Sequence, residues 1–141
     1  MVISIASDHA GYELKEIIKN YFDMNDIIFI DFGTTGTESV DYPTYAKKVC
    51  SSIQAGESSF GILVCGTGIG MAIAANKQRG IRAANCCDTY SAKMTRLHND
   101  ANVLTLGSRV TGSGLAIEIV KQFLSVEFEG GRHSERVNML N

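Results

Sequence analysis

The sequence has no run of basic residues and no long apolar segment. Its 13 lysine and arginine residues are outnumbered by 15 aspartate and glutamate residues, for a formal net charge of −2. Without a basic excess, we expect no sequence-independent binding of nucleic acid. No apolar run approaches the roughly 20 residues that cross a bilayer. Met1 to Ala6 lacks the basic leader of a signal peptide and is typical of a first strand, so we expect a cytoplasmic protein.

Cysteine is present, but without the spacing of a metal site. The four cysteines, Cys50, Cys65, Cys86 and Cys87, include no Cys-x-x-Cys pair and no paired histidine ligands accompany them. We therefore predict no zinc site and no metal cofactor. In a reducing compartment all four should be thiols. Cys50, Cys86 and Cys87 are expected to be small buried apolar side chains, whereas Cys65 stands in a sequence context that suggests chemistry.

Repeats, low-complexity tracts and linkers are also absent, which favours a single domain over residues 1–141. Five strand-like runs alternate with helix-length segments, the pattern of βαβ units. Right-handed crossovers between parallel strands then predict an α/β fold, a three-layer α/β/α sandwich around a sheet of about five parallel strands. The expected strands are Val2–Ala6, Ile27–Phe32, Phe60–Cys65, Ile81–Ala84 and Asn102–Leu106.

Between these strands, apolar residues recur with a spacing near 3.6, which predicts helices that cover the sheet. One feature of the second helix is the only proline, Pro43, which suits a first helical turn, with Asp41 as a candidate cap. Glu129 to Gly131 is expected only to separate the last long helix from a short tail. The apolar positions are Leu14, Ile17, Ile18 and Tyr21 in the first helix, and Leu115, Ile119, Val120 and Phe123 in the last long one.

Glycine and polar residues gather after the third strand, where ligands bind in parallel α/β folds. The segment Cys65-Gly66-Thr67-Gly68-Ile69-Gly70 leads into a predicted helix. Peptide N–H groups of such a loop can face an anion at the positive helix end. The same field favours a thiolate, so Cys65 is a candidate nucleophile or base. Alternatively, the glycines only form a tight turn and Cys65 is a buried strand residue. A dinucleotide-binding loop is disfavoured because the third glycine comes one residue too early for Gly-x-Gly-x-x-Gly.

Histidine and arginine residues later in the chain suggest proton transfer and phosphate binding. Histidine is the natural proton carrier near neutral pH, and His98 lies at the end of a helix that begins near Asp88. The alternative for His98 is a solvated partner of the helix dipole. Arg132 and Arg136 would share one face of a helical tail and could grip a phosphate, with Arg109 following the fifth strand. The alternative is a solvated surface helix.

Six short motifs span nearly the whole chain in a specific order. They are Ser7-Asp8-His9-Ala10-Gly11, Asp41-Tyr42-Pro43, Cys65-Gly66-Thr67-Gly68-Ile69-Gly70, His98-Asn99-Asp100, Gly107-Ser108-Arg109 and Gly130-Gly131-Arg132-His133. Together they resemble ribose-5-phosphate isomerase type B, in a family that also includes galactose-6-phosphate isomerase subunits. The resemblance implies a Rossmann-like fold and a homodimer, or a tetramer built from it, with active sites shared between subunits. It also implies an enzyme of the pentose phosphate pathway without cofactor.

The resemblance also implies a role for each motif residue. Cys65 would be the base that moves a proton between C2 and C1 of the sugar, and His98 the acid that helps to open the furanose ring. The loop would stabilise the enediolate, with Thr67 adding a hydroxyl. The implied substrate-binding residues are Asp8, His9, Tyr42, Gly66, Gly68, Ile69, Gly70, Asn99, Arg109, Arg132 and Arg136.

Other functions remain open at this point. Relatives in the same family act on six-carbon sugar phosphates, and pocket depth cannot be read from sequence. A thiol-dependent phosphatase needs an arginine six residues after the cysteine, where this chain has Met71. A non-catalytic ligand-binding module would need neither Cys65 nor His98 for its function.

Overall fold

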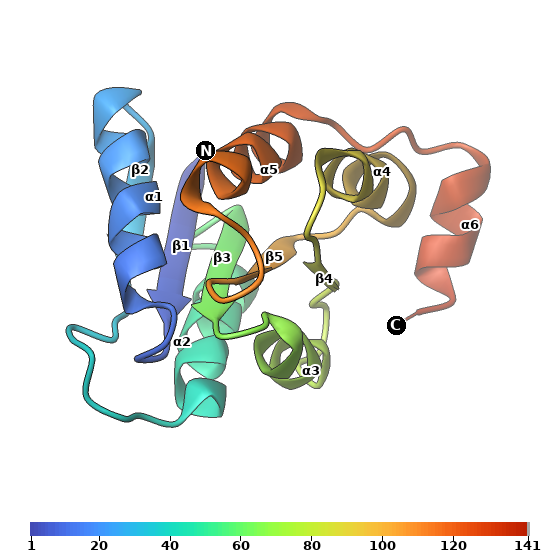
Figure 1. Ribbon diagram of the computed structural model, residues 1–141. Coiled ribbons are helices and arrows are strands. Elements are labelled where there is room, and N and C mark those ends of the chain that lie inside the picture. The colour runs from blue at the N-terminus through green and yellow to red at the C-terminus, as the bar shows by residue number, and fades with distance from the viewer. Residues whose placement is uncertain (141) are drawn as a thin grey trace.

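The computed structural model describes residues 1–140 and has helices and strands in alternation (Figure 1). All strand pairs are parallel, and the sheet order is β2-β1-β3-β5-β4. The predicted α/β sandwich with a five-stranded parallel sheet is confirmed. The elements are β1 (Val2–Ser7), α1 (Tyr12–Met24), β2 (Ile28–Asp31), α2 (Tyr42–Gln54), β3 (Phe60–Cys65), α3 (Ile69–Asn76), β4 (Ala83–Asn85), α4 (Thr89–Asn99), β5 (Val103–Gly107), α5 (Ser113–Ser125) and α6 (Arg132–Asn138).

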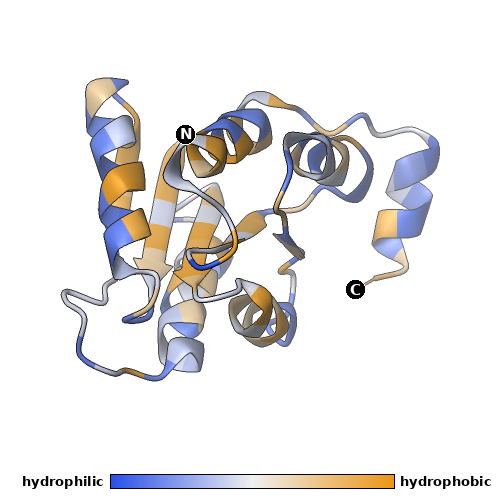
Figure 2. Cartoon of the chain, viewed as in Figure 1, coloured by the Kyte–Doolittle hydropathy of each residue, from blue (hydrophilic) through white to orange (hydrophobic). Residues whose placement is uncertain are grey.

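Helices cover both faces of the sheet, which explains why its central strands are apolar throughout. Alternate residues of β3 point to opposite faces: Ile62 and Val64 pack in the cluster under α1, α4 and α5, whereas Leu63 packs in the cluster under α2 and α3. Figure 2 shows hydrophobic residues concentrated on β1 and β3. Helix α6 lies outside these layers, beside α4 (Figure 1). Among residues 1–140, no helix is long and apolar enough to span a bilayer.

The two edge strands are shorter than predicted. Strand β2 lacks the first and last residues of the expected run, and β4 begins at Ala83 although Ile81 was expected to start it. Ile81 is buried but precedes the strand. Apolar runs therefore predict the central strands well but overestimate the length of the edge strands, which pair with only one neighbouring strand.

Two predicted core positions on the helices are wrong. Ile17 is 44% exposed and Leu115 is 45% exposed. In α1 the buried stripe is Leu14, Ile18 and Phe22, spaced four residues apart, so Ile17 lies beside it. In α5 the stripe is formed by Ala116, Ile119, Val120 and Phe123, and Leu115 again lies beside it.

Burial separates the cysteines into two kinds. Cys50 and Cys86 are buried as predicted, and burial raises the pKa of each thiol to about 11. The prediction is wrong for Cys87, which is exposed. Cys87 follows the short β4 and directly precedes Asp88, whose carboxylate caps α4 by accepting a hydrogen bond from the Ser91 N–H at 2.6 Å.

Helix α2 begins as predicted, with Pro43 in its first turn. Asp41 is the residue before the helix, but its side chain accepts no capping hydrogen bond. The predicted capping role of Asp41 is therefore wrong, although the predicted helix start is confirmed.

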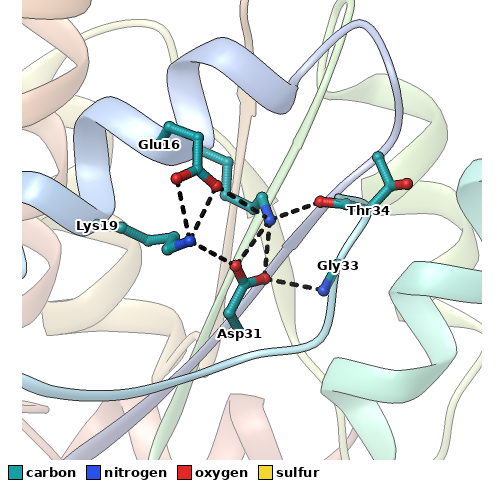
Figure 3. Close-up of polar contacts among 6 residues, drawn as sticks. Glu16, Lys19, Asp31, Gly33 and Thr34 are labelled. Carbon is teal, nitrogen blue, oxygen red and sulfur yellow. Dashed lines mark hydrogen bonds and ion pairs between the residues drawn. The ribbon is translucent and has the colours of Figure 1, made fainter. Parts of the chain in front are cut away.

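A buried lysine ties α1 to the chain that leaves β2 (Figure 3). Lys15, whose side chain is 1% exposed, donates to both carboxylate oxygens of Asp31 at 2.8 Å and to the Thr34 carbonyl at 2.7 Å. Asp31 also accepts from Lys19 at 2.8 Å and from the Gly33 N–H at 2.8 Å. Burial alone would raise the pKa of Asp31, but these hydrogen bonds outweigh it and the pKa is lowered. The network anchors the loop that continues to α2.

We predict that Lys15→Met destabilises the protein by about 1–3 kcal/mol, because it leaves the buried Thr34 carbonyl and part of Asp31 without a donor. Urea unfolding measures the effect. The loss should shrink as the pH falls through the lowered pKa of Asp31, since a carboxylate with a depressed pKa contributes stability only while it is ionised.

The matched control is Lys121→Met, which removes an exposed lysine paired with Glu118 and should change stability by less than about 1 kcal/mol. Equal urea midpoints for the two variants would show that the Lys15 network does not stabilise the fold.

Candidate active site

The sulfur of Cys65 faces a peptide N–H at the junction between β3 and α3. Cys65 is the last residue of β3 and is 5% exposed, and its Sγ accepts a hydrogen bond from the Gly68 N–H at 3.1 Å. The hydroxyl oxygen of Thr67 accepts from the Ile69 N–H at 3.3 Å. The sulfur thus lies within reach of the N-terminal end of α3, where unpaired N–H groups favour negative charge.

Two glycines make this tight junction possible. Gly68 has φ +80°, in the left-handed region, and a side chain there would collide with Asn85. Gly107, at the end of β5, lies so close to the Thr67 backbone that an added Cβ would be 2.6 Å from its carbonyl oxygen. A residue with a side chain at either position would push the loop away from the sulfur.

Asn85 supports the loop from the end of β4 and was missed by the sequence analysis. Its amide group donates to the Thr67 carbonyl at 3.4 Å, and its oxygen accepts from the Thr105 hydroxyl at 3.1 Å. A polar residue at the carboxyl end of a predicted strand was the available signal, but the end of that strand was placed one residue too early.

Residues after β5 join the loop to the end of β1. The Ser108 hydroxyl donates to the Ala10 carbonyl at 2.7 Å, and the Ser108 N–H donates to the Cys65 carbonyl at 2.9 Å. The Arg109 guanidinium lies against Gly66, with Nη1 3.3 Å from the position of an added Cβ. A cation therefore does stand near the cysteine loop, although the position six residues after Cys65 is the buried Met71.

The loop after β1 contributes an acid and a histidine. The Asp8 carboxylate accepts from the Gly11 N–H at 3.0 Å. His9 Nδ1 accepts from the Val40 N–H at 3.1 Å, so Nδ1 carries no proton and neutral His9 carries its proton on Nε2. Of the predicted site residues, this edge of the sheet holds Asp8, His9, Tyr42, Cys65, Gly66, Thr67, Gly68, Ile69, Gly70 and Arg109, which we call the cysteine half-site.

The other predicted residues lie at the opposite edge of the sheet. Helix α4 leaves the carboxyl end of β4 and leads to the amino end of β5, so its last residues, His98 and Asn99, lie at the amino edge. Strand β5 pairs Gly107 with Cys65, and its five residues span roughly 13 Å. A single chain therefore does not bring His98 to Cys65.

Helix α6 completes the second group. It is helical from Arg132, which is the condition under which Arg132 and Arg136 share one face, and it packs beside α4. His98, Asn99 and Arg136 line a hollow of about 290 Å³. We call His98, Asn99, Arg132 and Arg136 the histidine half-site.

Two residues that the sequence analysis passed over lie beside His98. The His98 and His133 rings stack 4.2 Å apart with an angle of 13° between their planes. The Glu129 carboxylate lies 3.8 Å from His98 Nε2 and 3.7 Å from His133 Nε2. Burial, together with His98 and Arg132, lowers the pKa of His133.

The predicted role of residues 129–131 as a simple separator is therefore wrong. The Glu129 N–H donates to the Leu97 carbonyl at 3.1 Å and fixes the segment to the end of α4. The motif that ends in His133 was the available signal for this cluster, but the contact with His98 depends on packing between two helices.

Comparison with known proteins gives a family over nearly the whole length. Residues 3–140 match the family described as Ribose/Galactose Isomerase. The chain is 47% identical over 138 residues to ribose-5-phosphate isomerase B of Escherichia coli (strain K12), covering 98% of this chain and 93% of that protein.

Solved structures agree with this match. Ribose-5-phosphate isomerase B of Clostridium thermocellum superposes with a TM-score of 0.98 at 52% identity, covering 99% of this chain and 95% of that one. The enzyme of Mycoplasma genitalium with bound ribulose-5-phosphate has a TM-score of 0.94 at 39% identity, covering 99% of this chain and 93% of that one. The chain therefore belongs to the Ribose/Galactose Isomerase family and is an isomerase.

Proposed function

We propose that this protein interconverts ribose 5-phosphate and ribulose 5-phosphate with Cys65 as the general base. The observation that carries the proposal is the hydrogen bond from the Gly68 N–H to the Cys65 sulfur at the start of α3. The names of the Escherichia coli and Clostridium thermocellum relatives, and the ribulose-5-phosphate bound to the Mycoplasma genitalium enzyme, support a pentose phosphate as substrate.

The chemistry requires a base and fixed hydrogen-bond donors. In the open-chain aldose, the Cys65 thiolate takes the proton from C2, the C–H electron pair forms the C1–C2 double bond, and the carbonyl oxygen gains negative charge. Peptide N–H groups from Gly66 to Gly70 and the Thr67 hydroxyl would stabilise that oxyanion. The hydroxyl proton on O2 then passes to O1, which moves the negative charge to O2. Return of the first proton from Cys65 to C1 re-forms a carbonyl at C2 and gives the ketose, so one base suffices for both transfers at carbon. Dependence on a free thiol suits the reducing cytoplasm.

The remaining residues would bind and open the sugar. His98 would donate a proton to the ring oxygen, whereas Asp8, His9 and Asn99 would bind hydroxyl groups. The planar guanidinium group of arginine can donate to two phosphate oxygens at once. Arg109, Arg132 and Arg136 would therefore bind the phosphate. Tyr42, whose ring lies against Gly70, would line the pocket.

A complete active site would need two copies of the chain. The cysteine and histidine half-sites occupy opposite edges of one sheet, so the histidine half-site of a second copy must supply His98 and the tail arginines. In a symmetric dimer the same contact forms twice, and two active sites result.

One surface of the molecule is suited to this contact. Ile69 and Ile73 on α3 are 53% and 57% exposed. A hollow beside these isoleucines is bordered by Asn76 and Lys77, which also border a larger hollow of about 580 Å³. The larger hollow is bordered by Asn99 as well, and Asn99 also lines the hollow at His98. The exposed apolar residues and the adjoining hollows form a continuous face between the two half-sites.

Replacing Cys65 tests the general base. Cys65→Ala should lower kcat for ribose 5-phosphate by about 10²- to 10⁴-fold, the usual contribution of such a group. The exposed Cys87→Ala is the matched control and should retain activity. Assays on ribose, allose and galactose phosphates in parallel test the substrate, and faster turnover of a hexose phosphate would overturn the pentose assignment.

Mixing two inactive variants tests the shared active site. In a mixed dimer, one subunit carries Cys65→Ala and the other carries Arg132→Ala and Arg136→Ala. One of its two sites then combines the intact cysteine half-site of the arginine variant with the intact histidine half-site of the cysteine variant. Random exchange of subunits from an equal mixture should restore about a quarter of wild-type activity, because half the dimers are mixed and each has one working site.

The control for this experiment mixes Cys65→Ala with His9→Ala, two variants of the same half-site, and should restore no activity. Failure of the first mixture to recover, despite subunit exchange verified by mass spectrometry, would show that each chain works alone.

Deuterium exchange tests the ring-opening role of His98. Ribulose 5-phosphate cannot close a five-membered ring because its C5 oxygen carries the phosphate, so proton exchange at its C1 needs only the base. In D2O, His98→Ala should keep this exchange, followed by NMR, while losing turnover of ribose 5-phosphate, whose ring must open before the base can act. Cys65→Ala should lose both. Equal loss of both activities in His98→Ala would assign His98 to proton transfer at carbon instead.

A further inference from the structure

We propose that His98, Glu129 and His133 form a binding site for a divalent transition-metal ion, with Zn²⁺ as the best fit, and that the bound ion inhibits the isomerase. One ligand atom from each residue lies within 4.8 Å of the other two. Both Nε2 atoms approach the same carboxylate oxygen, at 3.8 Å from His98 and 3.7 Å from His133. Binding of the ion does not depend on the proposed function, whereas its inhibitory effect rests on the proposed role of His98.

An unpartnered nitrogen points to a missing ligand at this cluster. His133 is only 6% exposed, and its Nε2 is buried without a hydrogen-bond partner within residues 1–140. Buried polar atoms nearly always have a partner, because leaving one unpaired costs free energy. The nitrogen lies 3.7 Å from a Glu129 carboxylate oxygen, so an ion held between the two side chains would satisfy it.

The ligand set selects the class of metal. Two imidazole nitrogens and one carboxylate oxygen are the three protein ligands of many zinc sites in which the fourth position remains open. Mg²⁺ and Ca²⁺ prefer sites made of oxygen atoms. The three residues come from α4, from the segment before α6 and from α6 itself, which explains why no metal-binding spacing is visible along the chain.

The ligand atoms must move closer together to bind the ion. With metal–ligand distances of about 2.0–2.2 Å, tetrahedral ligand atoms lie about 3.4 Å apart, a few tenths of an ångström closer than the two distances here. One of the stacked rings must also tilt so that both nitrogens point at the ion. The side chains of His98 and Glu129 are 40% and 57% exposed, so they can adjust while buried His133 stays in place.

Nearby positive charge limits the affinity of the site for a metal ion. Arg132 and Arg136 stand on the same short helix as His133 and oppose a cation, whereas they favour a phosphate. An ion bound to His98 Nε2 keeps that nitrogen from carrying a proton and holds the ring beside Glu129, so ring opening by His98 should stop while the ion stays.

Metal titration tests the site without relying on activity. Zinc also binds thiols, so the binding measurement uses the full-length protein with Cys65→Ser and Cys87→Ser. Addition of Co²⁺ should produce visible absorption bands that saturate at one ion per chain, and Zn²⁺ should displace it. Glu129→Gln in this background should weaken Co²⁺ binding by at least about tenfold. Loss of a residue that only supports a metal ligand already has an effect of that size.

The matched control is Glu127→Gln, an exposed glutamate two residues away on the same segment, which should bind Co²⁺ like the parent. Unsaturable binding, or equal affinity in the Glu127 and Glu129 variants, would overturn the metal site and leave the isomerase proposal intact.

The inhibition is measured separately in enzyme that retains its thiols. Zn²⁺ should inhibit the wild type and the Glu127→Gln variant at the same concentration, and Glu129→Gln should need at least about tenfold more, each compared with its own metal-free rate. Co²⁺ binding with the same Zn²⁺ sensitivity in both variants would keep the metal site but overturn inhibition through it, and would assign the inhibition to another zinc ligand such as the Cys65 thiolate.

Discussion

The hydrogen bond from the Gly68 N–H to the Cys65 sulfur links the fold to the proposed chemistry. It forms because β3 ends at Cys65 and α3 begins only four residues later, with Gly68 in a left-handed conformation between them. Neighbouring strands hold the junction closed: Gly107 leaves room for the Thr67 backbone, and Ser108 hydrogen-bonds to the Cys65 carbonyl. The Cys65 thiol therefore accepts a hydrogen bond from one peptide N–H and also packs in the apolar cluster under α2 and α3.

Parallel topology imposes a second constraint. Each crossover helix returns the chain to the amino edge of the sheet, so residues at the end of a helix cannot face residues at the end of a strand. His98 ends a helix and Cys65 ends a strand. The proposed dimer follows from this separation, because a second copy is the simplest source of the missing half-site. The same constraint places Arg132 and Arg136 beside His98 and leaves Arg109 beside Cys65.

Polar groups inside this protein stabilise loops that carry site residues. Lys15, on the buried face of α1, donates to the Thr34 carbonyl after β2. It thereby anchors the loop between β2 and α2, whose Val40 N–H donates to His9. Arg96, also buried, donates to the Asp100 carboxylate and the Ala101 carbonyl at the end of α4. These interactions are costly to break once formed, because each would leave a buried charge without a partner. The loops are therefore held by charge as well as by packing.

The order of strands and helices, the glycine loop and the family resemblance could all be predicted from the sequence, because apolar periodicity and turn residues act over short stretches of chain. The shortened β2 and β4, the exposed Ile17 and the missing Asp41 cap could not, since they depend on which neighbours cover each residue. The residues of the candidate site were likewise identified one by one, but their division into two half-sites appears only once the sheet is assembled. His98, Glu129 and His133 show the reason most clearly. His98 is far from the other two along the chain, and only the packing of α6 and the segment before it beside α4 brings the three together.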